Sequence, residues 1–189
     1  MSLKSVLAFA ATNSTTSINK RLVLHAAQVL QDELGAEVEI ETLDLNDFDM
    51  PVYSPEREKM GIPEAAEEFF ARLGAADGLL ISFAEYNGNY TAAFKNIFDW
   101  SSRIKMAIYQ DKPVLMMATS PGKGGGQNVL RVATEAAPFF GGNLTGSFKF
   151  GPFAEHFDTD TERLKTTKLA LELREALVAF NVAVQAASD

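Results

Sequence analysis

The sequence predicts an α/β fold in three layers, with a parallel sheet covered by helices on both faces. Short apolar runs of strand length alternate along the chain with longer segments whose apolar residues recur at helical spacing. The central runs are apolar at every position, which is typical of strands buried on both faces of a parallel sheet. The chain has 189 residues and neither a linker nor a repeat, so one domain is expected over residues 1–189.

Strands are expected at five places along the chain. The first covers Ser5–Ala10, and the second, half-polar one covers Val38–Leu43 and is expected near an edge. The others are expected at Gly78–Phe83, Pro113–Ala118 and Leu144–Phe150. Five parallel strands with helical crossovers fit the order 2-1-3-4-5 of a flavodoxin-like sheet, with right-handed connections.

The segments between the strands carry helical stripes and cap signals. Helices are expected at residues 22–34, 63–73, 91–102, 128–140 and 161–187. Asp44–Gly61 is expected to be a long irregular loop, and such loops are usually functional or mobile. In sheets of this order ligands bind beyond the carboxyl ends of the strands, where the order reverses. The residues that follow the first, third and fourth strands are therefore the expected ligand site.

Composition excludes several kinds of function. Lys and Arg number 17 against 25 Asp and Glu, so the net charge is -8, and we expect no nucleic-acid partner. The chain has no cysteine and 2 histidines, which leaves little material for a metal site, and none is expected. No apolar run reaches the ~20 residues of a membrane span, and the start shows no signal peptide. A cytoplasmic protein without a membrane partner is expected.

The loop after the first strand, Thr12–Asn19, is dense in hydroxyl groups and opens a helix. Helix N-terminal N–H groups attract anions, and hydroxyls add donors, so the loop predicts a phosphate site. The alternative is a cluster of caps and turns, although a cap needs only one such residue. The loop contains no glycine, which excludes the G-x-G-x-x-G dinucleotide motif, and Gly122-Lys123 lacks the spacing of a Walker A loop.

The loops after the third and fourth strands suit a flat ligand. The first of them, Ala84–Tyr90, holds two tyrosines, two asparagines and a glycine, which offer ring faces for stacking and donors for ring edges. The second, Thr119–Gln127, holds four glycines, which let a backbone approach a ligand closely. The alternatives are a capped loop with packed tyrosines and a flexible glycine loop.

Three segments together resemble the NADPH-dependent FMN reductase family, which includes quinone, chromate and azo-dye reductases. Glu85-Tyr86-Asn87, followed by Phe94–Arg103, is similar to the family pattern E-Y-N, spacer, L-K-N-x-x-D-W-x-S-R. Pro51-Val52-Tyr53 is similar to its P-L-Y segment, and the segment 120–126 to its S-x-G…G-G loop. The resemblance covers about residues 4–150.

The resemblance implies an enzyme that uses FMN and takes a hydride from NADPH or NADH. Electrons would pass to a small-molecule acceptor: a quinone, a nitro or azo compound, or free flavin. The cofactor does the chemistry, so no catalytic side chain is expected. A homodimer or homotetramer, with the flavin near the subunit contact, is also implied. The implied cofactor-binding residues are Thr12, Ser14, Ser17, Ile18, Asn19, Val52, Tyr53, Glu85, Tyr86, Asn87, Gly88, Ser120, Pro121, Gly122 and Gly125.

The chain departs from the family in the first loop, where Ser14 stands in place of an arginine that would face the phosphate. Loss of that cation removes a charge-assisted hydrogen bond worth ~1–3 kcal/mol. Two alternatives to the enzyme therefore stay open: a non-enzymatic FMN-binding electron carrier or redox-responsive module, and a relative that binds another phosphorylated ligand. Lys95 and Asp99 are expected to pair along one helix, and Trp100 to serve packing or an oligomer contact.

Overall fold

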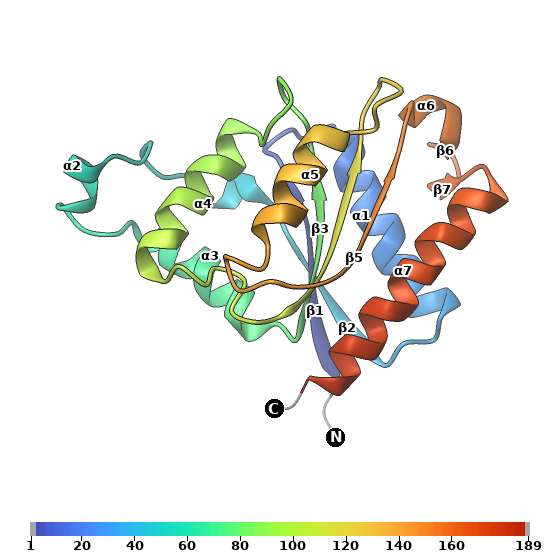
Figure 1. Cartoon of the computed structure of the whole chain (residues 1–189), viewed down its shortest axis with the longest axis horizontal. Coiled ribbons are helices and arrows are strands. Elements are labelled where there is room, and N and C mark those ends of the chain that lie inside the picture. Colours follow the sequence, from blue (N-terminus) through green and yellow to red (C-terminus); the bar gives the residue numbers. More distant parts are fainter. Residues whose placement is uncertain (1–2, 188–189) are drawn as a thin grey trace.

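The computed structural model describes residues 3–187 and has three layers, with the sheet between two sets of helices (Figure 1). The central sheet has five parallel strands in the order β2-β1-β3-β4-β5, which confirms the predicted fold class and strand order. The strands are β1 Lys4–Ala11, β2 Val38–Leu43, β3 Gly78–Phe83, β4 Pro113–Thr119 and β5 Asn143–Phe150.

The sequence pattern of each strand reflects its place in the sheet. Every residue of β3 and β4 is buried, and these central strands are covered by helices on both faces. The edge strand β2 exposes Glu39 and keeps Val38 and Leu43 buried, as its half-polar sequence predicts. The opposite edge is β5, whose pairing with β4 shifts by a residue between Val114 and Leu115.

The helices pack their apolar stripes against the two faces of the sheet. On one face lie α1 (Ile18–Gln28), continued by a π-helical turn at Val29–Glu33, and α7 (Thr167–Ala186). On the other face lie α3 (Glu64–Ala75), α4 (Ala92–Ile104) and α5 (Gln127–Ala136). The helix α5 ends at Ala136 and not at Phe140 as predicted. Pro138 accounts for this end: Ala137 is still helical and donates to the Ala133 carbonyl, but Pro138 has no backbone N–H to make the next helical hydrogen bond.

Two segments hold structure that the sequence did not predict. A helix was expected to begin at residue 161, but residues 153–164 form the one-turn helix α6 (Phe153–His156) and a hairpin of β6 (Phe157–Asp158) and β7 (Arg163–Leu164). The stretch 44–61 contains a 3-10 turn at Leu45–Asp47 and the one-turn helix α2 (Pro55–Glu58). Residues 51–63, which we call the arm, project from the body of the molecule with α2 at the tip (Figure 1).

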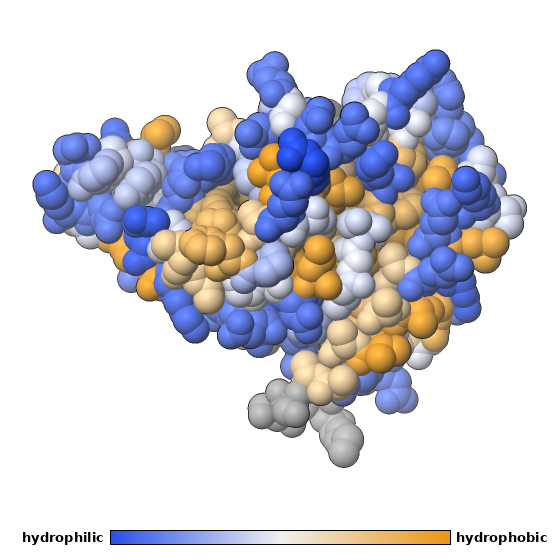
Figure 2. All heavy atoms as spheres, viewed as in Figure 1, coloured by the Kyte–Doolittle hydropathy of each residue, from blue (hydrophilic) through white to orange (hydrophobic). Residues whose placement is uncertain are grey.

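Large apolar side chains are exposed at several places on the surface. Leu171, Val178 and Val182 are 54%, 47% and 64% exposed along α7, where Figure 2 shows apolar atoms gathered towards its C-terminal half. The arm exposes Val52 and Met60. Within residues 3–187, no helix is both long enough and apolar enough to span a bilayer, and no cluster of potential ligands is suited to a metal ion.

Candidate functional site

The three loops selected from the sequence meet at the carboxyl ends of β1, β3 and β4. Between them lies a cavity of about 220 Å³, which we call the central cavity. Small-molecule sites usually measure roughly 300–1,000 Å³, so a ligand as large as FMN would extend beyond it. The lining residues are Ser14, Thr16, Ser17, Ile18, Asn19, Ala84, Glu85, Tyr86, Thr119, Ser120 and Pro121.

The N-terminus of α1 forms one wall of this cavity. Its first turn is capped by Ser17, whose Oγ accepts from the backbone N–H groups of Asn19 (3.2 Å) and Lys20 (3.3 Å). Thr12 Oγ1 accepts from the Ser14 N–H at 3.2 Å. The backbone N–H groups of residues 15–18 have no hydrogen-bond partner within residues 3–187. Unpaired donors at the positive end of a helix form an anion site.

The side chain of Asn19 is buried and ties this helix to the sheet. Its Oδ1 accepts from Ser82 Oγ and from the Thr119 N–H, both at 2.9 Å. Its Nδ2 donates to the Thr119 carbonyl at 3.1 Å. Asn19 therefore joins the first turn of α1 to the ends of β3 and β4. Asn19 and Thr119 are 100 residues apart in the sequence, so no local sequence pattern predicts this contact.

The loop after β3 turns back on itself and presents an aromatic ring. Tyr86 and Asn89 exchange backbone hydrogen bonds of 3.0 and 3.2 Å around Asn87-Gly88. Both turn residues have positive φ, 53° and 77°, which is the geometry of a tight hairpin turn with an Asn-Gly centre. Tyr86 is 50% exposed at the cavity, so its ring has a free face.

The glycine loop, residues 120–126, closes the other side of the cavity. Gly125 has a φ of +61°, and a Cβ there would lie 2.7 Å from the Phe150 carbonyl carbon and oxygen. Gly126 begins α5 without a side chain to cap it. The Glu85 carboxylate supplies the cap: its Oε2 accepts from the N–H groups of Asn128 (2.8 Å) and Val129 (2.9 Å).

No lysine or arginine lines the central cavity among the described residues. The nearest cation in sequence, Lys20, pairs with Asp44 at 2.7 Å, and its hydrogen bond holds the pKa of that carboxyl below its usual value. Lys20 lines a neighbouring hollow of about 480 Å³, which borders the central cavity at Thr16 and Ser17. An anion in the central cavity would thus be held by hydroxyl and backbone groups.

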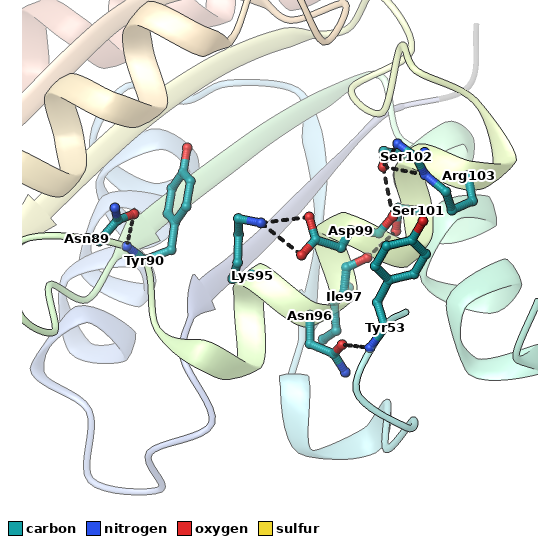
Figure 3. A network of polar contacts seen from close by, with 10 residues as sticks. All are labelled: Tyr53, Asn89, Tyr90, Lys95, Asn96, Ile97, Asp99, Ser101, Ser102 and Arg103. Atoms are coloured by element: carbon teal, nitrogen blue, oxygen red, sulfur yellow. Dashed lines mark hydrogen bonds and ion pairs between the residues drawn. The ribbon is translucent and has the colours of Figure 1, made fainter. Parts of the chain in front are cut away.

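Much of the motif on α4 holds the arm rather than the cavity (Figure 3). Asn96 Oδ1 accepts from the Tyr53 N–H at 2.8 Å, and its Nδ2 donates to the Pro51 carbonyl at 3.2 Å. The buried Trp100 donates from Nε1 to the same carbonyl at 2.7 Å and packs edge-on against the Tyr53 ring. Arg103 lies over that ring, 5.7 Å from its centre.

The ion pair and the packing role predicted on α4 are both found in the structure. Lys95 Nζ contacts both carboxylate oxygens of Asp99, at 2.7 and 2.8 Å, which confirms an ion pair along the helix (Figure 3). Trp100 is 1% exposed, so it serves packing within the chain. Tyr90 packs among phenylalanines, and burial raises the pKa of its phenol to about 12.

The structure brings together most, but not all, of the residues selected from the sequence. Those that line the central cavity are Ser14, Ser17, Ile18, Asn19, Glu85, Tyr86, Ser120 and Pro121. Those outside its lining are Thr12, Val52, Tyr53, Asn87, Gly88, Gly122 and Gly125. Val52, which is 74% exposed, lines a separate hollow of about 540 Å³ with Asn13 and Asn96. The sequence missed Thr16, although it belongs to the same run of hydroxyls.

Solved structures place this architecture among flavodoxin-like proteins. The chain superimposes on FerB, a flavoenzyme NAD(P)H:(acceptor) oxidoreductase from Paracoccus denitrificans, with a TM-score of 0.74 over 96% of this chain and 97% of that one. A flavodoxin from Pseudomonas aeruginosa gives a TM-score of 0.55 over 96% and 99%. The sequence identities are 22% and 12%, so these two similarities show a shared fold and no more.

Sequence comparison then defines the family. Residues 5–151 match the model of the NADPH-dependent FMN reductases, and the chain belongs to this oxidoreductase family, whose name gives NADPH and FMN as what its members use. An NAD(P)H-dependent FMN reductase from Pseudomonas aeruginosa is 32% identical over 51% of this chain and 52% of its own length. An NADPH:quinone oxidoreductase from Arabidopsis thaliana is 33% identical over 56% and 53%. The chain thus aligns with about half the length of these relatives.

Proposed function

We propose that this chain binds FMN at the central cavity and oxidises NADPH or NADH, passing the electrons to a small-molecule acceptor. Quinones, nitro or azo compounds and free flavin are the proposed acceptors. The single observation that carries the proposal is the N-terminus of α1, with unpaired N–H donors at residues 15–18 beside the hydroxyls of Ser14 and Ser17. Membership of the NADPH-dependent FMN reductase family supports it.

The residues present fit the chemistry of this cofactor. Helix N–H groups and hydroxyls suit a phosphate, the exposed face of Tyr86 suits a planar ring, and the glycine loop lets backbone groups approach a ring edge. FMN held by these groups would supply the redox chemistry, with hydride taken from a nicotinamide and electrons passed on to the acceptor. The proposed site comprises Thr12, Ser14, Ser17, Ile18, Asn19, Val52, Tyr53, Glu85, Tyr86, Asn87, Gly88, Ser120, Pro121, Gly122 and Gly125.

The protein side chains bind and orient in this proposal. Ser17 fixes the first turn of α1 through its cap, so the unpaired N–H groups of residues 15–18 would be held in place for an anion. Asn19 contributes through its ties to Thr119 and Ser82, which fix α1 against the strand ends. Tyr86, half exposed at the cavity, would offer its ring for stacking. No proton donor or acceptor is required of a side chain.

The test is a titration of FMN with the apo-protein, followed by quenching of flavin fluorescence. We expect saturable binding in the micromolar range or tighter. Ser17→Ala is expected to weaken it by roughly 2- to 30-fold, because loss of an N-cap costs about 0.5–2 kcal/mol and 1.4 kcal/mol is tenfold. Ser54→Ala, which removes the cap of α2 at the tip of the arm, is the matched control and should bind as the wild type. Absence of binding by the wild-type chain at high concentration contradicts the proposal.

Ser14→Arg tests the departure from the family at the phosphate. A guanidinium beside the unpaired donors adds a charge-assisted hydrogen bond, so FMN affinity should rise roughly tenfold or more. An unchanged affinity would show that the phosphate lies elsewhere.

Oxidation of NAD(P)H by the FMN-loaded protein, with and without a quinone, distinguishes an enzyme from an electron carrier. A carrier binds FMN but leaves NAD(P)H unoxidised until a separate reductase is added. A relative specialised for another phosphorylated ligand would fail to bind FMN, yet gain thermal stability with that ligand. We expect turnover that depends on both FMN and the nicotinamide.

A homodimer or homotetramer is also proposed, from the resemblance to the family. The exposed apolar side chains of the arm, Val52 and Met60, support it, since exposed apolar groups at a protruding segment are typical of contact surfaces. Light scattering after size-exclusion chromatography measures the mass of the particle, and a value near 20.6 kDa, the mass of one chain, would contradict the proposal.

A further inference from the structure

We propose that Glu85 is a positioning residue, whose carboxylate holds the glycine loop and the start of α5 against the central cavity. The inference rests on the proposed function, because it assigns to Glu85 a role in forming the FMN site. The residue was selected from the sequence as a border of the flavin ring. The structure assigns its side chain to a different task.

The carboxylate connects the loop after β3, which lines the cavity, to the start of α5, which directly follows the glycine loop. Glu85 leaves the end of β3 and reaches Asn128 and Val129, 43 and 44 residues further along the chain. Its Oε2 accepts both backbone N–H groups, and Oε1 lies 3.4 Å from Asn128 Nδ2. Within residues 3–187, these are the hydrogen bonds that join the loop after β3 to the start of α5.

The start of α5 needs this contact because its own N-cap offers none. Gly126 occupies the cap position in the left-handed region, with a φ of +75°, and has no side chain to accept from the first turn. A carboxylate at that point also complements the positive end of the helix. The Glu85 side chain thus accepts the hydrogen bonds that a serine or aspartate at the N-cap position would otherwise accept, and that Gly126 cannot.

The glycine loop is held from two sides. On the side away from the cavity, Ser120 accepts from the Phe153 N–H at 2.9 Å, and Gly125 packs directly on the Phe150 carbonyl. On the cavity side, Asn19 holds Thr119 at the start of the loop, and Glu85 holds Asn128 and Val129 just after its end. Without Glu85, the loop keeps its other supports and loses the contact that ties its far end to the loop of Tyr86. The width of the central cavity between Tyr86 and the glycine loop is therefore expected to depend on Glu85.

The test compares FMN affinity and amide exchange in wild type, Glu85→Ala and Glu85→Gln. In Glu85→Ala, FMN binding should weaken roughly 3- to 30-fold, and the amide protons of Asn128 and Val129 should exchange faster in the apo-protein. Glu85→Gln should recover binding to within roughly threefold, because an amide oxygen has two lone pairs and can accept both N–H groups. Glu85→Asp keeps the charge but is one methylene shorter, so it should bind as weakly as Glu85→Ala.

Asp77→Ala is the matched control. Asp77 also uses a carboxylate to join distant segments, accepting from the Ser5 N–H at 2.8 Å, but it does so at the amino ends of β1 and β3, at the end of the strands opposite the cavity. Its loss should lower the melting temperature and leave FMN affinity unchanged. All titrations are made well below the lowest melting temperature of the set.

The outcomes separate the two proposals. Wild-type affinity in Glu85→Ala, or a loss equal to that in Asp77→Ala, overturns the positioning role and leaves the proposed function intact. Weak binding by Glu85→Gln, as weak as by Glu85→Ala, also overturns it, since hydrogen bonding would then not be what the site needs. A wild-type chain that binds no FMN overturns the proposed function and this inference with it.

Discussion

Substitution of Asn19 by alanine should destabilise the fold far more than an asparagine in a loop normally would. The side chain is 2% exposed and makes three hydrogen bonds, one from Ser82 and two with the backbone of Thr119. Alanine removes all three and leaves the Thr119 N–H and carbonyl, at a residue 1% exposed, without those partners. A buried polar group without a partner costs more than a hydrogen bond contributes.

The magnitude follows from these contacts. Three hydrogen bonds at about 1 kcal/mol each give about 3 kcal/mol, and the unpaired backbone groups of Thr119 raise the loss to about 3–5 kcal/mol. For a chain of this length, 1 kcal/mol corresponds to roughly 2–4 °C, so the melting temperature should fall by roughly 6–20 °C.

Thermal and urea unfolding, followed by circular dichroism of the apo-protein, measure both quantities without reference to a ligand. Asn46→Ala is the matched control, because the exposed Asn46 side chain also makes hydrogen bonds, to Asn13 and Asp44. Its loss should cost less than about 1 kcal/mol, since water replaces those contacts. A loss below about 1 kcal/mol in Asn19→Ala would refute the tie between α1 and the strand ends.

Three further outcomes are expected. Trp100→Phe removes the 2.7 Å hydrogen bond to the Pro51 carbonyl, so stability should fall by about 1 kcal/mol and limited proteolysis should cut the arm sooner. Burial lowers the pKa of His25 in the folded chain below 6.5, so the unfolded chain binds the proton more tightly and the free energy of unfolding decreases as the pH falls below 6.5. Between pH 7.5 and 5.5, that free energy should change less in His25→Gln than in the wild type. Gly125→Ala forces a side chain into a left-handed conformation against Phe150, which should cost about 1–3 kcal/mol in urea unfolding, and an unchanged midpoint would contradict the close approach.

The strand order was predictable because burial leaves a direct mark on sequence. Strands covered on both faces must be apolar throughout, as β3 and β4 are, and the half-polar β2 lies at an edge. Helix ends were predicted less well. The signal at Pro138 was present and was overlooked, as was Ser54-Pro55, a cap and first-turn pair that begins α2. The hairpin of β6 and β7 has two residues in each strand, too few for any periodicity.

The meeting of the three loops was predictable, since parallel strands end at one edge, but the roles of individual side chains were not. Asn19 and Glu85 both belong to loops that the sequence predicts to contact a ligand, and their side chains also bind protein groups 100 and 43 residues away. A contact between residues so far apart in sequence depends on the order of the strands and on the reach of the side chain. The residues next to Asn19 or Glu85 in the sequence predict neither.

The motif on α4 shows why a strong resemblance does not translate into a list of ligand contacts. Asn96 and Trp100 hold the Pro51 carbonyl, and Arg103 lies over Tyr53, so the most specific part of the resemblance fixes the base of the arm. The arm bears Val52 and Met60 outward, away from the central cavity of its own chain. The α4 motif and the arm segment, two of the three segments that carry the family resemblance, therefore form one packed unit in the structure.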